Sequence, residues 1–365
     1  MTIRRWLPLF LLLALVAAFF ERPRPQGSEL ILHEWGTFTC LQDETGQALG
    51  GINTDDEPVP DFVHSLGPIV RNRTDSKGTG APVLPGVTLR LETPVVYIYP
   101  SVQDPHPRLD LHVEFRGGWL TQFYPAATRA DAPGLPDALS SRTVGRLEWD
   151  GIQVGTPESG PSTDLPVWTA PRLAGAPGLT VGQEHESYLF YRGVGHLDSP
   201  LRIRANRLAT STVPVARLWV AHIRADGTTA YRRVEGPVGA NQVALPAPEG
   251  FSAGNLARLR LELQAALEAD GLYEREAVAM LKTWEVSYFQ SPGLRVFYLV
   301  PRVWTDQVLP LHLSVPAQVE RVMMGRVELI SPEQREVLER MRGGRAEEDD
   351  YRRLGRFAEA LLRTL

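Results

Sequence analysis

LDLHVEFR, residues 109–116, alternates apolar and polar residues at every position. In an extended chain the apolar residues would all point to one side and the polar residues to the other. This period of two predicts a β-strand with one buried face and one face in water. Gly117-Gly118 follows at once and residues 119–124 are largely apolar, so we expect a β-hairpin here.

Two further glycine-containing pairs predict turns. Asp150-Gly151 separates residues 146–149 from 152–154, and Asp226-Gly227 separates residues 215–224 from 229–234. Glycine supplies the positive φ angle that two-residue hairpin turns require, and hairpins imply antiparallel pairing. With other strands expected at 29–41, 87–99, 187–191 and 201–206, residues 28–248 are predicted to form an antiparallel β-sandwich or open barrel with long loops.

After residue 248 the pattern becomes helical. Leucines recur at helical spacing up to Gly271, and a second apolar stripe spans 277–288, which predicts two antiparallel helices. Ser331 and Gln334 are placed to form the capping box of a later helix. We expect residues 249–365 to form an α+β segment that either folds alone or adds to the main sheet, with strands at 294–300 and 319–330 and helices from 332 and over 351–365.

The N-terminal segment, residues 1–27, has the pattern of an export signal. Arg4 and Arg5 precede an uninterrupted apolar run from Trp6 to Phe20. This run is shorter than the roughly 20 residues that comfortably span a bilayer. The pattern is compatible with a cleaved signal peptide and with an uncleaved membrane anchor. Either one places the chain outside the cytoplasm, as a periplasmic or extracellular protein that is secreted or held at the membrane.

The composition argues against several classes of function. The net charge of −5 over 365 residues gives no basic surface for nucleic acid. The chain has no P-loop, no Gly-x-Gly-x-x-Gly, no Gly-x-Ser-x-Gly and no His-Glu-x-x-His motif, which argues against nucleotide enzymes, dinucleotide oxidoreductases and α/β-hydrolases. The single cysteine, Cys40, cannot form an internal disulfide.

Several segments resemble an uncharacterised family of exported bacterial proteins that begins with a His-Glu-Trp-Gly-Thr-Phe-Thr segment. The resemblance covers most of the exported part, so it implies one continuous unit, but it brings no activity, cofactor or catalytic residue. The matching segments are His33 to Thr39, Glu92 to Val95, Phe190 to Gly195, Gly271 through Trp284, and Gly293-Leu294-Arg295 to Pro301.

Two groups of residues are candidate metal ligands. His185, His196 and Asp198 flank the strand expected at 187–191, and imidazole with carboxylate is a ligand set that zinc accepts. Asp55 and Glu57 alternate with other residues as oxygen ligands do in calcium loops. For the first group the alternative is a pair of surface histidines, and for the second group it is an acidic loop in water. We therefore predict no cofactor, with calcium and zinc as the candidates if there is one.

Glu34 is a candidate for an unusual carboxylate. It follows His33 on the first strand and shares its face with apolar residues, so it needs a partner, for which Arg192 and Arg295 are candidates. The alternatives are a buried ion pair that fixes the sheet register and a carboxylate with a perturbed pKa that acts as an acid or base.

Aromatic residues on strands offer a second type of binding candidate. Tyr97 and Tyr188 could form a platform for sugar rings, or they could simply pack in the core. From these observations we expect a non-catalytic cell-envelope protein that binds a protein or polysaccharide partner through loops of its β body. The alternative is a metal-assisted envelope hydrolase using the His, Glu and Asp residues named above.

Overall fold

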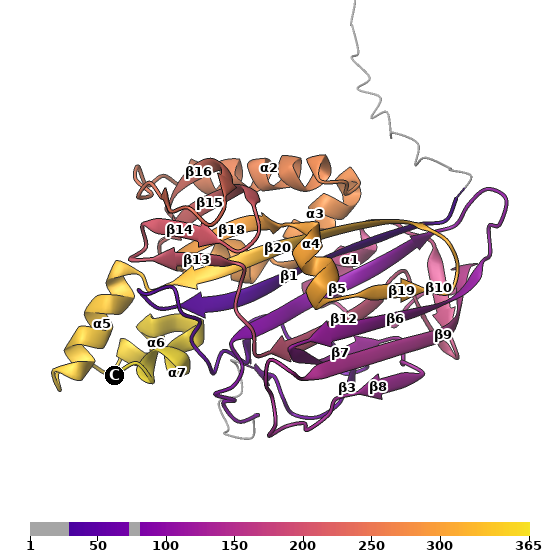
Figure 1. Ribbon diagram of the computed structural model, residues 1–365, viewed down its shortest axis with the longest axis horizontal. Helices are drawn as coiled ribbons and strands as arrows, with labels where there is room; N and C mark the ends of the chain where they lie inside the picture. Colours follow the sequence, from indigo (N-terminus) through magenta and orange to yellow (C-terminus); the bar gives the residue numbers. More distant parts are fainter. Residues whose placement is uncertain (1–28, 73–80) are drawn as a thin grey trace, which may run out of the picture.

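The computed structural model describes residues 29–72 and 81–365, so the expected export segment lies outside the described residues (Figure 1). The chain is mainly β, built around one 15-stranded sheet. Its strands follow the order β11 (Glu184–Glu186), β10 (Gly178–Val181), β9 (Val144–Thr156), β7 (Gly118–Tyr124), β12 (Leu189–Gly195), β5 (Leu89–Tyr99), β1 (Ile31–Gln42), β20 (Gln318–Leu329), β18 (Gly293–Val300), β15 (Val215–Ile223) and β16 (Thr229–Val238).

Four further strands extend this sheet, and others form two small sheets. β3 (His64–Ser65) pairs with β7, β8 (Arg129–Asp131) pairs with β9, and β6 (Arg108–Arg116) pairs with both β9 and β19 (Leu311–Leu313). One small sheet consists of β13 (Leu201–Arg204), β14 (Leu208–Ser211) and β17 (Val243–Ala244). The other consists of β2 (Thr54–Asp55) and β4 (Arg71–Asn72).

The large sheet is mixed, which corrects the expectation of a purely antiparallel body. β1 pairs with β5 in the antiparallel sense but with β20 in parallel, so that Glu34 lies opposite Arg321. All twelve residues of β1 are buried, as is usual for a strand in a parallel pair with both faces covered. β18 and β20, from the C-terminal part of the chain, lie between β1 and β15 in this sheet.

Of the three expected hairpins, the one at Asp226-Gly227 is confirmed and the other two are wrong. β15 and β16 pair directly across Asp226-Gly227, with Gly227 at φ +79°. At Gly117 (φ +94°) the chain turns, but β6 pairs with β9 whereas β7 pairs with β12. Gly151 (φ +68°) lies inside the continuous strand β9, where one extra residue forms a β-bulge opposite β6.

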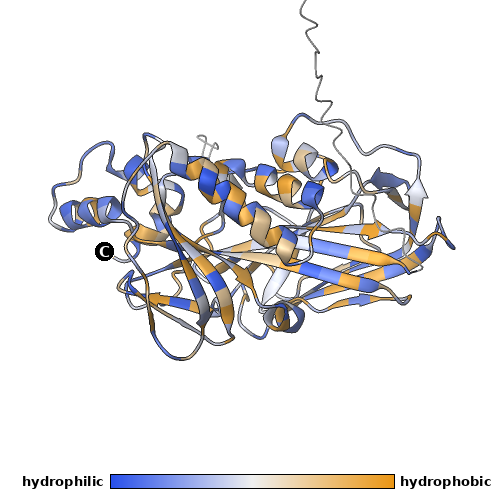
Figure 2. Cartoon of the chain, turned by 90° about the horizontal axis from the view of Figure 1, so that it is seen from above, coloured by the Kyte–Doolittle hydropathy of each residue, from blue (hydrophilic) through white to orange (hydrophobic). Residues whose placement is uncertain are grey.

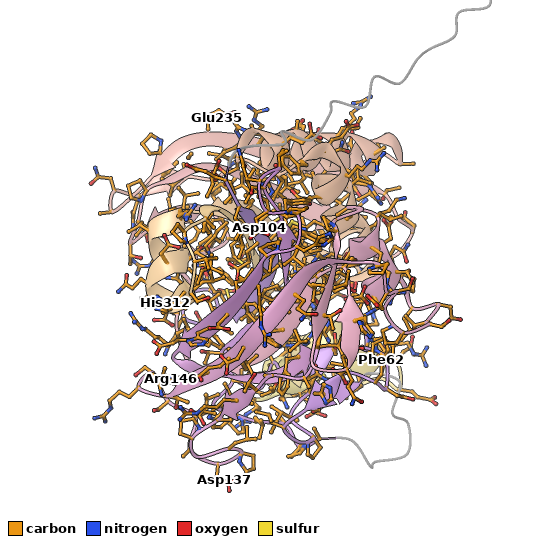
Figure 3. The ribbon with its side chains drawn as sticks, turned by 90° about the vertical axis from the view of Figure 1, so that its right-hand side faces the viewer. Phe62, Asp104, Asp137, Arg146, Glu235 and His312 are labelled. Carbon is orange, nitrogen blue, oxygen red and sulfur yellow. The ribbon has the colours of Figure 1, made fainter. Side chains whose placement is uncertain are left out.

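The alternation that predicted β6 is confirmed. Its apolar residues are buried, and its polar residue Glu114 pairs with Arg146 of β9 at 2.9 Å on the wet face. Figure 3 shows Arg146 and His312 of β19 at the edge of the molecule, and Figure 2 shows the same alternation as bands of colour along the strands.

Helices cover one face of the sheet (Figures 1 and 2). They are α1 (Pro166–Arg172), α2 (Gly254–Ala269), α3 (Glu274–Thr283) and a π-helical turn, η1 (Glu285–Gln290). Leu263 of α2 and Met280 of α3 share a core with Trp35 and Trp219 from the strands. A separate core on the other side of the sheet contains Phe38 and Trp304, which lies on α4 (Arg302–Val308).

The C-terminal segment packs against the end of the sheet where β1 finishes. The expected capping box of α5 (Pro332–Arg342) is confirmed, because the Ser331 hydroxyl accepts from the Gln334 amide and the Gln334 side chain accepts from the Ser331 amide. The last helix was expected to be continuous but is interrupted. Gly355, at φ +77°, divides it into α6 (Asp350–Leu354), the 3₁₀ turn η2 (Gly355–Phe357) and α7 (Ala358–Leu362). Among the described residues, no helix has the length and apolar character that would let it cross a bilayer.

Candidate functional site

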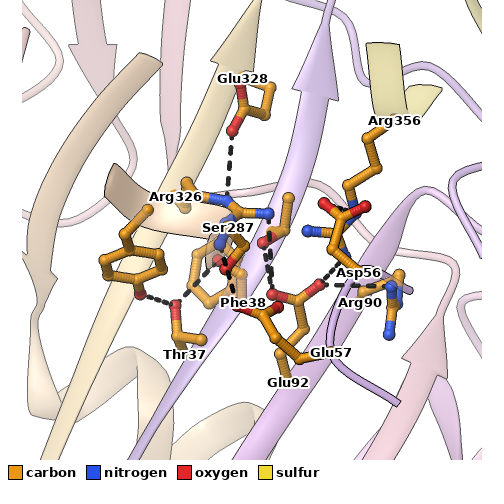
Figure 4. Close-up of polar contacts among 12 residues, drawn as sticks. Thr37, Phe38, Asp56, Glu57, Arg90, Glu92, Ser287, Arg326, Glu328 and Arg356 are labelled. Atoms are coloured by element: carbon orange, nitrogen blue, oxygen red, sulfur yellow. Dashed lines mark hydrogen bonds and ion pairs between the residues drawn. The ribbon is translucent and has the colours of Figure 1, made fainter. Parts of the chain in front are cut away.

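Ten charged side chains lie together inside the protein, and we call them the buried charge cluster. Figure 4 shows the part of the cluster around Glu92. None of the ten side chains is more than 10% exposed. Charges at this depth are stable only when they are paired and hydrogen-bonded. The cluster consists of five arginines, Arg90, Arg192, Arg295, Arg326 and Arg356, and five carboxylates, Asp55, Asp56, Glu57, Glu92 and Glu328.

Glu92 on β5 is the carboxylate with the most partners. It forms ion pairs with Arg356 of η2, with Arg90 at 3.4 Å and with Arg326 at 3.8 Å, and it accepts a hydrogen bond of 3.0 Å from the Thr39 hydroxyl. Burial alone would raise its pKa, but these arginines hold the pKa of Glu92 well below its ordinary value. The cluster therefore joins the C-terminal segment to the centre of the sheet.

The backbone around the cluster is irregular. The pairing of β1 with β5 shifts register between Trp35 and Thr37, and the pairing of β12 with β5 shifts between Phe190 and Gly193. Between these shifts lies Thr93 at φ +44°, an uncommon angle for a residue other than glycine, and its hydroxyl accepts a 3.0 Å hydrogen bond from Arg192. Bulges and strained residues collect at functional sites and at positions where the surrounding structure fixes them.

Glu57 has a different environment from Glu92. Its Oε1 accepts from the backbone amide of Ser287 at 2.9 Å, whereas its Oε2 is buried with no hydrogen-bond partner among the described residues. Burial raises the pKa of Glu57 to about 7. Ser287 lies in the π-helical turn η1, a type of element often found at functional sites. No pattern in the sequence indicated the buried position of Glu57 or the π-helical turn.

The structure corrects the expected partners of Glu34. Its carboxylate pairs with Arg321 at 2.5 Å and accepts from the Tyr191 hydroxyl, and neither Arg192 nor Arg295 is its partner. Arg192 instead pairs with Asp55 inside the cluster. The expectation that Glu34 is buried and paired is nevertheless right, because it is 1% exposed.

Arg295 and His33 bind other groups. Arg295 lies 3.2 Å from Glu328 and donates to the backbone carbonyls of Ser287 and Tyr288. His33 contacts Glu276 of α3 through Nδ1 at 2.7 Å, which ties β1 to the helical layer. Both residues therefore connect elements of the fold.

The tyrosine platform for sugar rings is wrong. Tyr97 and Tyr188 are both 0% exposed, and their hydroxyls donate to the carbonyls of Pro171 and Trp168. Their rings lie 6.0 Å apart in an edge-to-face arrangement within the core below α1. Core packing, the alternative reading of these residues, is the arrangement observed.

The structure does not bring the candidate metal ligands together. Asp55 and Glu57 belong to the buried charge cluster, where Asp55 binds arginines. His185 contacts the Thr180 hydroxyl at 2.8 Å through Nδ1, while Asp198 pairs with Arg202. Within residues 29–72 and 81–365, no group of three or more His, Cys, Asp and Glu side chains is placed to hold a metal ion.

Two of these residues instead line a polar groove on the surface, which we call the loop groove. Its cavity volume is ≈ 580 Å³, within the range of small-molecule sites. It is formed by the turn after β1, the residue before β5, the loop before β9, the connection from β12 to β13 and the start of β13. The lining residues are Thr45, Gln47, Ala48, Thr88, Ser141, His196, Leu197, Asp198 and Arg202.

Hydrogen bonds within the protein fix the walls of the loop groove. The Asp43 carboxylate accepts from the backbone amides of Thr45 and Gln47 at 2.8 and 2.9 Å. The Thr88 hydroxyl donates to the Leu197 carbonyl and accepts from the Leu197 amide, both at 3.0 Å. Such bonds reduce the entropy lost when a ligand binds.

His196 is also held in place. Its Nδ1 lies 2.7 Å from the carbonyl oxygen of Gly86. Because a carbonyl can only accept, Nδ1 carries the proton, and Nε2 of the neutral ring is an acceptor. His196 and Asp198, which the sequence offered as metal ligands, thus lie in one groove, where Asp198 pairs with Arg202.

Comparison of the sequence with models of known protein families gave no match, and a search of the curated proteins found no similar protein. We therefore infer function from the geometry of the loop groove and of the buried charge cluster alone.

Proposed function

We propose that the chain is a non-catalytic protein of the cell envelope that binds a partner in the loop groove. One observation carries this proposal: loops from four separate parts of the chain meet at one groove whose walls are fixed by internal hydrogen bonds. Loops on a rigid scaffold are where binding residues usually lie.

The interior of the protein supports a binding role for these loops. The amides of Gly51 and Ile52 both donate to the Val87 carbonyl, which joins the segment after Ala48 to the segment before Thr88. The adjoining residues, Asp55 to Glu57, are held by the buried charge cluster. The loops of the groove are thus attached to the rigid centre of the sheet.

Two further parts of the proposal concern location and packing. The apolar run from Trp6 to Phe20 supports export to the periplasmic or extracellular side, with the chain either secreted or anchored.

We also propose a sandwich-type packing of β6 and β9 against β1 and β5, supported by the core that Leu111, Trp149, Phe38 and Leu91 share. No contact in the described residues favours the metal-assisted hydrolase over the binding role.

The test is co-sedimentation of the purified protein with isolated cell-envelope material. We expect the wild type to sediment with the envelope and H196A together with Q47A to reduce the bound fraction by most of its value. H112A is the matched control, because His112 is also an exposed surface histidine but lies on β6, outside the loop groove. Equal binding by all three proteins would contradict the proposal.

A further inference from the structure

The loop groove is nearly neutral, although it contains an arginine and an aspartate. Arg202 lies 2.5 Å from Asp198, and both side chains are about half exposed, at 51% and 54%. The two charges compensate each other before any ligand arrives. An anionic ligand would have to compete with Asp198 for the guanidinium, and a cation would have to compete with Arg202 for the carboxylate.

The groove also lacks the features that anchor a protein partner. Seven of its nine lining residues are polar, and the two apolar ones are Ala48 and Leu197. Protein interfaces depend on large apolar or aromatic residues buried at the centre, and none of the nine is a phenylalanine, tyrosine or tryptophan. A peptide would therefore find hydrogen bonds here but no anchor.

What the groove offers is a mixture of hydrogen-bond donors and acceptors. Asp198 and Nε2 of His196 accept, and Arg202 donates. The side-chain amide of Gln47 and the Ser141 hydroxyl can do both, whereas the Thr45 hydroxyl, which donates to Asp43, can accept. A sugar hydroxyl both donates and accepts, so neighbouring hydroxyls on a ring match this arrangement. A neutral ligand rich in hydroxyls can pair with these groups, and unlike a peptide it does not depend on an apolar anchor.

We propose that the loop groove binds a neutral oligosaccharide segment through hydrogen bonds to its hydroxyl groups. This inference rests on the proposed function, because it specifies the chemical class of the partner that the groove holds. The Asp198–Arg202 pair is its centre, with the carboxylate accepting from one hydroxyl and the guanidinium donating to its neighbour.

The test is ligand-observed NMR on the full chain. The probes are maltotriose and cellotriose as neutral trisaccharides, trigalacturonate as an acidic one, and a polar tripeptide. We expect at least one neutral trisaccharide to bind and D198N together with R202Q to weaken this binding about tenfold or more, since hydrogen bonds to charged groups are stronger than those between neutral groups. Both substitutions are at exposed positions, where an ion pair adds little to stability.

R217Q together with E235Q is the matched control. This pair is also exposed, at 3.2 Å, but lies on β15 and β16, away from the groove. Unchanged trisaccharide binding by the control, with loss in the groove variant, supports the inference. Binding of the tripeptide or of trigalacturonate in preference to both neutral sugars would overturn the ligand class and leave the proposed function standing. Failure of both neutral trisaccharides to bind, with envelope binding still dependent on His196, would overturn the ligand class too.

Discussion

Replacing Glu57 by glutamine should make the protein more stable at neutral and alkaline pH. Burial raises the pKa of Glu57 from its ordinary value of 4.5 to about 7, so the folded state favours the protonated form. A group of this kind contributes its full stability below pH 4.5 and loses it as the pH rises through 7. For the wild type we expect this group to lower the free energy of unfolding by about 2–3 kcal/mol between pH 5 and pH 8.

Glutamine keeps an oxygen that can accept from the Ser287 amide, and it carries no charge at any pH. Glu57→Gln should therefore remove this part of the pH dependence, and at pH 8 it should be the more stable protein by about 3 kcal/mol. Urea unfolding followed by tryptophan fluorescence at pH 5, 6, 7 and 8 measures both curves. Glu235→Gln, at an exposed position, is the control. Parallel curves for the wild type and Glu57→Gln would refute the reasoning.

Two other substitutions test the buried charge cluster and the C-terminal segment. Arg356→Met removes a buried partner of Glu92 and should cost about 3–5 kcal/mol in urea unfolding, whereas Arg356→Met with Glu92→Met should recover a large part of that loss. A loss below about 1 kcal/mol in the single variant would contradict this role. Ser331→Ala removes the hydroxyl that accepts from the Gln334 amide and should cost about 1 kcal/mol in the same assay; an unchanged midpoint would show that the cap is unimportant.

The sequence allowed the strands to be predicted better than their partners. Alternation along residues 109–116 predicted β6 correctly, because the side chains of the strand itself determine which of its two faces is buried. Gly117 and Gly151 indicated where the backbone takes positive φ, which both of them do. A positive φ does not determine which strand pairs with which, so the same signal that gave a hairpin at Gly227 gave a change of partner at Gly117 and a bulge at Gly151.

The candidate site shows the same limit. Burial of Glu34 followed from its apolar neighbours, but Arg321 is 287 positions away in the chain and meets it only because β1 and β20 pair in parallel. Arg90 and Glu92 sit in an otherwise apolar strand, and two charges in such a strand are a usable signal for a buried network. Asp198 was predicted as a metal ligand, but it pairs with Arg202, and that pairing depends on the local turn of the chain.

The most direct test of the account is hydrogen exchange of the full chain, measured by mass spectrometry with and without soluble envelope polysaccharide. Binding in the loop groove predicts slower exchange in peptides that cover residues 45–48 and 196–202, and unchanged exchange in α2 and α3. Slower exchange confined to α2 and α3, or no change in the peptides of the groove, would contradict it.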